Sequence, residues 1–307
     1  MTKIQQVLWE LEMDYIGHPY YVSGNAILHA IGQHLDADVH ASLAASHGVI
    51  VPGQFGTLPE EHSQSGIRPY LGSGLPEVEA YDDLFLQRDA MHPWLLDTRA
   101  RDALNTHDLR VHGGHPTLAH ETIMGRREGQ RKQQQTTKWY VHAYLHADDP
   151  QTLPVGEAVL DELQFGGKRN YGYGEVQLKE TQVVDLDALD YSRLTGAKTY
   201  LIQLVTPYVV ESEYPEANDT TVPWWWAESR EDLRFREEKI LEQREVSHLQ
   251  TVDHGQVVKY IGDRPVETAK NGLLRVGSHS RYGFGELRVK PLQKNNKQSG
   301  TKSELQN

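Results

Sequence analysis

Two segments of the chain place cations and aromatic rings among closely spaced glycines. The first runs from Gly166 to Gly174 and the second from Gly277 to Gly285. Such spacing lets backbone N–H groups point into one concavity, which favours an anion such as phosphate. Arginine grips a phosphate through two hydrogen bonds, and aromatic rings stack on bases. The mixture therefore predicts contact with single-stranded RNA rather than with duplex DNA, whose readers usually present a helix to the major groove.

Every residue of the two segments is a candidate for RNA binding. In the first segment these residues are Gly166, Gly167, Lys168, Arg169, Asn170, Tyr171, Gly172, Tyr173 and Gly174. In the second they are Gly277, Ser278, His279, Ser280, Arg281, Tyr282, Gly283, Phe284 and Gly285. No nucleotide cofactor is predicted, because neither segment has the G-x-G-x-x-G pattern after a strand or the GxxxxGK[ST] phosphate loop.

The two segments are copies of one pattern. The second starts 111 residues after the first, at 277 against 166. Both have glycine at positions one, seven and nine, tyrosine at six, an aromatic residue at eight and an acid at ten. That separation is a domain length, so the pattern indicates a duplicated domain. Two unrelated glycine-rich hairpins are the alternative.

The first half of the chain has the element order of one small domain. Alternating apolar residues predict strands at Lys3–Met13 and Trp139–Ala147. Ser23 is the expected cap of a helix from Asn25 to Leu35, and a second helix is expected from Pro154 to Leu163. The glycine segment and a last strand follow. Strands and helices in this order predict a ferredoxin-like (RRM-like) β-α-β-β-α-β domain.

The second half starts a similar series. A strand is predicted from Lys198, and a charged helix from Ser229 to about His248. Further strands are predicted near Gln256–Ile261 and Leu273–Val276, before the second glycine segment.

The predicted fold is therefore α+β, with two ferredoxin-like domains in tandem. The first covers residues 1–188 and carries an insertion at about 47–135, which is too long for a simple connection. The second covers residues 196–292, and residues 293–307 form a polar tail without pattern, expected to be disordered.

Composition limits the classes of function. The chain has 307 residues, a net charge of −12 and no cysteine. The charge argues against a protein that coats nucleic acid through a diffuse positive field. Without cysteine there are no disulfides, thiolate metal sites or cysteine nucleophiles, which fits a cytoplasmic protein. The sequence has no long apolar run and no signal peptide pattern, so no membrane association is predicted.

The glycine segments resemble the signature of the RAMP superfamily of CRISPR-associated proteins, a glycine-rich loop before the last strand of a ferredoxin-like domain. The match is close at Phe165–Gly174 and repeats at Gly277–Gly285, and Tyr20–Ile31 looks like the segment that enters the first helix. The resemblance implies an RNA-binding subunit of a CRISPR ribonucleoprotein in antiviral defence. It would hold single-stranded guide RNA and contact other CRISPR effector subunits.

A second subfamily of similar sequences gives a competing hypothesis. These proteins are metal-independent endoribonucleases that process CRISPR precursor RNA, and many use a histidine near the first helix. The reaction needs a base for the 2′-OH, an acid for the leaving oxygen and a cation for the phosphorane. His29 is the candidate base, with His18 and His34 nearby. A third hypothesis is a scaffold whose glycine hairpins only build protein interfaces.

Other clusters have weaker interpretations. The basic residues Arg126, Arg127, Arg131 and Lys132 could lie on the RNA backbone or form a solvated loop. The three tryptophans Trp224–Trp226 could anchor a partner subunit or cap the charged helix. His112, His115 and His120 lack the spacing of a recognised metal site, so no metal is predicted.

Overall fold

The computed structural model of the chain describes residues 2–13, 15–17, 21–52, 100–104, 118–122, 139–149, 151–195, 197–212, 233–242, 245–260, 262–275 and 277–292. These residues form an α+β fold, with mostly antiparallel sheets and few helices, as the sequence predicts. None of the helices in these ranges is long and apolar enough to cross a membrane.

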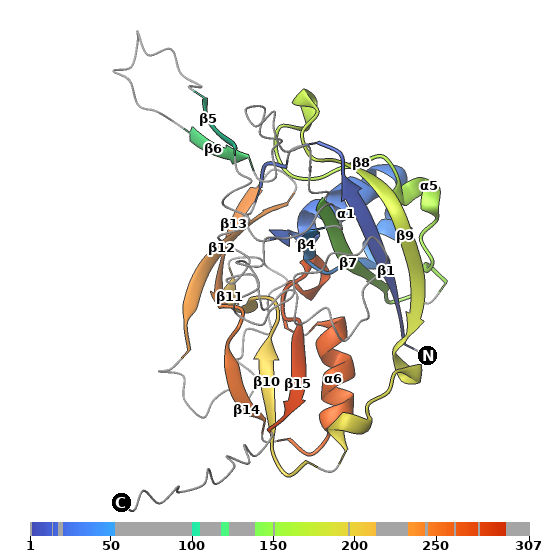
Figure 1. Cartoon of the computed structure of the whole chain (residues 1–307), viewed down its shortest axis with the longest axis vertical. Coiled ribbons are helices and arrows are strands. Elements are labelled where there is room, and N and C mark those ends of the chain that lie inside the picture. The colour runs from blue at the N-terminus through green and yellow to red at the C-terminus, as the bar shows by residue number, and fades with distance from the viewer. Residues whose placement is uncertain are drawn as a thin grey trace, which may run out of the picture.

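The largest sheet has its central strand at the start of the chain. Strand β1 (Lys3–Leu11) lies between β7 (Trp139–Ala147) and β9 (Glu175–Asp185), and β4 (Gly48–Pro52) follows β7. All these pairs are antiparallel. This order, β9-β1-β7-β4, is that of a ferredoxin-like sheet, and Figure 1 shows the strands side by side. Short strands complete the sheet: β2 (Tyr21–Val22), β3 (Leu43–Ala45) and β8 (Leu163–Gln164).

Short helices connect these strands. Helix α1 (Gly24–Ile31) begins where the Ser23 side chain accepts a hydrogen bond from the Ala26 N–H, as predicted. It continues into η1 (Gly32–His34), and α2 (Ala37–Ser42) leads into β3. The helix predicted over 154–163 is much shorter, since α5 covers only Glu157–Leu160. It stops there because Asp161 is extended and Glu162 has a left-handed backbone (φ 53°).

The second half contains two smaller sheets. In the first, β10 (Tyr200–Leu204) lies between β14 (Val257–Tyr260) and β15 (Leu287–Pro291), and α6 (Pro265–Leu274) packs on β15. In this sheet β10 lies between β14 and β15, just as β1 lies between β7 and β9 in the first sheet, and a helix precedes the last strand in both. In the second, β13 (Glu245–Val252) lies between β11 (Tyr208–Ser212) and β12 (Phe235–Glu242). The remaining elements are the pair β5 (Ala100–Leu104) and β6 (Leu118–Thr122), and the turns η3 (Arg169–Tyr171), η4 (Leu186–Ala188), η5 (Ser192–Leu194) and η7 (Ser280–Tyr282).

Both faces of the central strands β1 and β7 are buried, because the second half covers the face opposite α1. Strand β9 is exposed over much of its length. Trp9 and Val141 point to the side of α1, where they pack with Ile27 and its neighbours. Ile4, Leu8, Tyr140 and Tyr144 point the other way and pack with Val205 and Leu273 of the second half. The alternation predicted over 139–147 is confirmed, whereas in β1 Ile4 lies on the face opposite Val7 and Trp9. Neither side of β1 faces water.

The charged helix predicted over 229–248 is wrong for the residues that the structure describes there. These form the hairpin of β12 and β13. Burial alternates along β12: Glu237 and Lys239 are exposed, whereas Ile240 is buried in the core of the first half together with Leu249. Charges stand on both faces of β12, since Arg236 and Glu238 share the face of Ile240, and they conceal the period of two that marks a strand.

The strand predicted at 273–276 is also wrong. Helix α6 continues to Leu274, with Ala269, Gly272 and Leu273 on its buried side. Pro265 starts this helix at a position where its missing N–H is not needed. The strands predicted from Lys198 and near Gln256–Ile261 are confirmed as β10 and β14.

Candidate RNA-contacting site

The first glycine loop, residues 166–174, is a tight turn with an exposed tip. Lys168 has a left-handed backbone (φ 55°, ψ 31°), η3 follows, and Gly172 is left-handed again (φ 82°). The Phe165 N–H donates to the Gly174 carbonyl at 2.8 Å, which closes the base of the loop. The left-handed backbone of Lys168 costs a non-glycine residue about 1–2 kcal/mol of conformational free energy. The contacts around the loop must therefore stabilise this conformation.

The base of the loop is fixed to the segment that follows β1. The Gly167 N–H donates to the Ile16 carbonyl at 2.8 Å. A Cβ at Gly166 would lie 2.3 Å from that carbonyl oxygen, so only glycine allows this approach. Beneath the loop the buried ring of Phe165 meets Trp9 edge-on, with 5.2 Å between the ring centroids. The loop is therefore held firmly at its base and presents its tip to solvent.

The tip carries the predicted cation and ring. Tyr171 is 78% exposed, and Arg169 and Asn170 are also exposed. Lys168 and Tyr173 are half-buried. An exposed tyrosine on a fixed loop provides a stacking surface for a base, and the neighbouring cations can bind the backbone phosphates.

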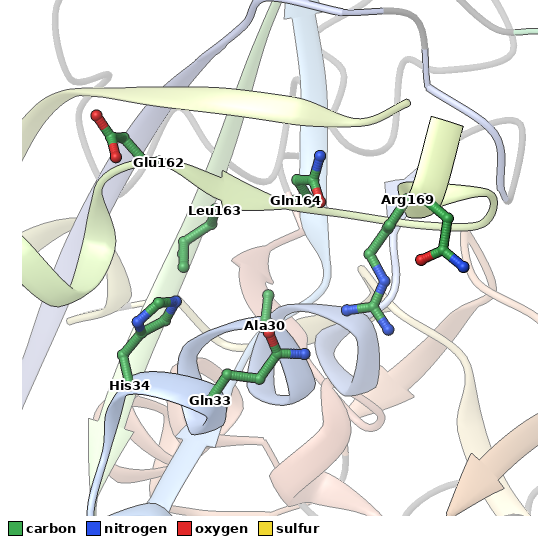
Figure 2. A pocket seen from close by; sticks show the side chains of 8 residues that line it. Ala30, Gln33, His34, Glu162, Leu163, Gln164 and Arg169 are labelled. Carbon is green, nitrogen blue, oxygen red and sulfur yellow. The ribbon is translucent and has the colours of Figure 1, made fainter. Parts of the chain in front are cut away.

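A cavity of about 250 Å³ lies between this loop, β8 and the end of α1. Its lining residues are Ala30, Gln33, His34, Glu162, Leu163, Gln164, Arg169 and Asn170. Figure 2 shows the Arg169 guanidinium extending toward the helix, and His34 and Glu162 lying at the other end of the cavity. A cation, an imidazole and a carboxylate thus line one polar cavity beside the exposed loop.

The second glycine loop, residues 277–285, has the same backbone as the first but different surroundings. His279 is left-handed (φ 62°), η7 follows, and Gly283 is left-handed (φ 100°). Tyr282 and Phe284 are only 7% and 5% exposed, and both belong to the core of the first half. These two rings were predicted to stack on bases, but in the structure they are packed in the interior.

The second loop docks against α1, α2 and β3. The Arg281 Nη2 donates to the His40 carbonyl at 2.7 Å, and its Nε donates to the Leu43 carbonyl at 3.0 Å. A Cβ at Gly24 would lie 2.4 Å from the Tyr282 carbonyl oxygen, so α1 begins in direct contact with the loop. The His47 ring meets Phe284 edge-on, with 5.0 Å between centroids. This loop therefore joins the two halves of the chain.

The predicted catalytic histidine lies outside the cavity below the first loop. His29 is exposed on α1, and it is His34, one turn further along, that lines the cavity below the first loop. His40 is close to the second loop, where burial, the Arg281 guanidinium and His29 lower its pKa.

The remaining predicted clusters lie outside the described residues. These are Arg126, Arg127, Arg131 and Lys132, the tryptophans 224–226, most of the insertion 47–135 and the tail 293–307. Among the residues that the structure does describe, no three His, Asp or Glu side chains are grouped as metal ligands.

The sequence did not single out Gln33, Glu162 or Gln164 as site residues. They reach the cavity because β8 pairs with the start of β9 and so brings its loop over the end of α1. The cavity thereby joins segments some 130 residues apart (34 against 164), and no local pattern marks their approach. His34 was noted only as a neighbour of His29.

No protein-family model matches the chain, and no curated protein matches it in sequence. The solved structures that are similar to the chain include the following two. One is a CRISPR associated protein Cas6, with 9% identity, a TM-score of 0.41 and coverage of 95% of this chain and all of that one. The other is a cryo-EM structure of the Type III-B Cmr-beta bound to cognate target RNA, with 10% identity, a TM-score of 0.32 and coverage of 84% and 86%. At these values neither likeness identifies a function for this chain.

Proposed function

We propose that the chain is an RNA-binding subunit of a CRISPR ribonucleoprotein that holds single-stranded guide RNA on its first glycine loop. The observation that carries the proposal is the exposed tip of this loop, where Tyr171 stands beside Lys168 and Arg169. A fixed loop with a ring and two cations suits a flexible strand whose bases are unstacked. The resemblance of this loop to the RAMP signature suggests the class of complex and its partner subunits.

The acidic charge of the chain agrees with local rather than diffuse binding. With a net charge of −12, the chain as a whole repels a polyanion, so affinity must come from a few contacts at close range. Stacking on one tyrosine contributes about 1–3 kcal/mol, which is comparable to the contribution of the cations at moderate salt. We therefore expect an affinity that falls only modestly with salt.

Fluorescence polarisation with a labelled single-stranded RNA of the cognate repeat tests the proposal. Tyr171→Ala should raise the Kd about 5- to 100-fold, which corresponds to the loss of one stacking contact. Lys259→Ala is the matched control: it also changes one exposed side chain, on β14 of the second half. An equal, small effect of both variants would remove the first loop from the binding site.

A metal-independent endoribonuclease is the second candidate, because the cavity below the loop contains the required groups. Glu162 can take the proton of the 2′-OH, the imidazolium form of His34 can protonate the leaving 5′ oxygen, and Arg169 can balance the phosphorane charge. The products would be a 2′,3′-cyclic phosphate and a 5′-OH. Incubation of repeat RNA in EDTA tests this activity. Loss of cleavage in His34→Ala but not in His29→Ala would place it in this cavity, and the reverse would favour His29.

The scaffold hypothesis has its own outcome. If the protein neither binds nor cleaves single-stranded RNA at low salt, its glycine loops serve only protein interfaces. The second loop already has such a role within the chain.

A further inference from the structure

A second cavity lies where the two halves of the chain meet. Its volume is about 380 Å³, and it is bounded by α2 and β3, the end of β7, the end of α6 and the second glycine loop. Its polar side chains include Arg275, Arg281, Asn271 and His146, together with Asp148. None of these residues except Arg281 was predicted to belong to a site.

The two guanidinium groups of this cavity are held in place before any ligand arrives. Main-chain carbonyls of α2 and β3 orient Arg281 through its Nε and Nη2. Within the described part of the chain, no hydrogen bond occupies its Nη1. Arg275 donates through Nε to the Ser280 carbonyl at 2.9 Å, and its Nη2 lies 3.1 Å from His146 Nδ1. Since these contacts fix both side chains, a ligand would not have to pay for ordering them.

The electrostatics of the cavity favour an anion. Burial and the Arg275 cation lower the pKa of His146 to about 4, against a smaller opposite effect of Asp148. His146 is therefore neutral at pH 7 and accepts a hydrogen bond from Arg275 without adding positive charge. Asp148 is exposed, and among the residues that line the cavity it leaves the two arginines in excess by one charge. Behind the lining, Arg275 also interacts with the buried Glu286, which accepts a hydrogen bond from Arg288. Arg275 is only 5% exposed, and so its charge is weakly screened by solvent.

We propose that this cavity binds a phosphate group, either free or in a phosphate ester. The arginines would supply its N–H donors, and the Asn271 amide and the Ser280 hydroxyl are further donors in the lining. The second glycine loop would then contribute a cation to the ligand while its rings remain in the core. The phosphate could belong to a free nucleotide or to an RNA strand, and the probes below distinguish these two sources.

Such a ligand would contact both halves of the chain at once. The lining comes from β3 and β7 on one side and from α6 and the second loop on the other. A ligand that binds the folded chain alone raises its melting temperature, and the rise grows with the logarithm of the ligand concentration above the Kd. The inference does not depend on RNA binding by the first loop, because Tyr171→Ala should leave the phosphate response unchanged.

The test uses the full chain and two single-residue variants that change the charge of the cavity in opposite directions. Asn271→Asp adds a negative charge to the cavity, and Asp148→Asn removes one. Both side chains are exposed, so neither change removes a buried contact. Circular dichroism and the melting temperature without ligand check that both variants fold.

Each variant is titrated with inorganic phosphate, AMP and labelled single-stranded RNA, at ionic strength matched with chloride. For a free ligand, Asn271→Asp should raise the Kd of phosphate or AMP about three- to tenfold, and Asp148→Asn should lower it by a similar factor. For an RNA phosphate, the Kd of RNA should move in the same two directions, with little response to the small probes. The proposal is overturned if both variants leave all three Kd values unchanged, or shift them in the same direction. Equal stabilisation of all proteins by phosphate also counts against it, since a solute excluded from the surface acts in that way.

Discussion

The two glycine loops share one sequence pattern and one backbone conformation, yet they have opposite environments. At position six the first loop has Tyr171, which is 78% exposed, and the second has Tyr282, which is 7% exposed. The acid at position ten is exposed as Glu175 and fully buried as Glu286. Burial raises the pKa of Glu286, although Arg288 and Arg275 act in the opposite direction. A motif thus determines the shape of a loop, whereas the rest of the fold decides what that loop contacts.

Alanine substitution of the two tyrosines should give the largest difference between the loops, measured as a change in the free energy of unfolding. Tyr282→Ala removes a ring from the shared core and should lower the free energy of unfolding by about 3–5 kcal/mol. Tyr171→Ala removes an exposed ring and should change it by less than about 0.5 kcal/mol. Urea denaturation of both variants measures this difference. Similar values for the two would contradict the assignment of the second loop to the core.

The glycines at position seven provide a second matched pair. A Cβ at Gly283 would lie 2.3 Å from His47 Nδ1, whereas a Cβ at Gly172 would meet nothing within 4 Å. Both have positive φ, so alanine costs about 1–2 kcal/mol at either position from the backbone alone. The clash adds to this, and we expect a total of about 3 kcal/mol for Gly283→Ala, measured by denaturation. If Gly172→Ala lowers the free energy of unfolding as much as Gly283→Ala does, the contact of the second loop with His47 is not the cause of the loss.

Acid should weaken the docking of the second loop. The pKa of His146, which contacts Arg275 behind this loop, is about 4 in the folded chain and near 6.5 when it is free. Between these values the unfolded chain binds a proton that the folded chain does not, so stability falls as the pH drops from 6.5 to 4. The loss attributable to His146 is at most about 3 kcal/mol.

His146→Gln should therefore flatten the dependence of stability on pH in this window. Burial lowers the pKa of His142 to about 3, so this residue also makes stability fall with acid. It is present in both proteins and contributes equally to their pH dependence. An unchanged slope in the variant would show that His146 titrates normally in the folded chain.

The smallest expected effect concerns salt. Arg169→Ala removes one cation from the first loop, and the slope of log Kd against log salt should decrease by about 0.7, the value for one phosphate contact on a single strand. Lys259→Ala should leave the slope unchanged. Polarisation measurements over a range of salt concentrations compare the two, and equal slopes in wild type and Arg169→Ala would mean that this guanidinium does not contact phosphate.

The sequence predicted the parts of the fold that depend on local patterns. Strand β7 and the cap of α1 follow from alternation and from Ser23. The concavity of N–H groups predicted for the first glycine loop is wrong, because the N–H groups of Gly167, Tyr171 and Gly172 donate to protein carbonyls.

The sequence failed where distant packing decides the structure. The charges of 229–248 indicate a helix, but the β12–β13 hairpin forms because Ile240 and Leu249 pack against the other half of the chain. For the same reason the sequence could not reveal that Tyr282 is buried, nor that Arg275 and His146 meet.

The most direct test of the central claim is ultraviolet cross-linking of single-stranded repeat RNA to the full chain, followed by peptide mass spectrometry. We expect a nucleotide adduct on the peptide that contains Tyr171, lost in Tyr171→Ala, and none on the peptide that contains Tyr282 and Phe284. An adduct on the second loop, or RNA binding without any adduct near Tyr171, would contradict it.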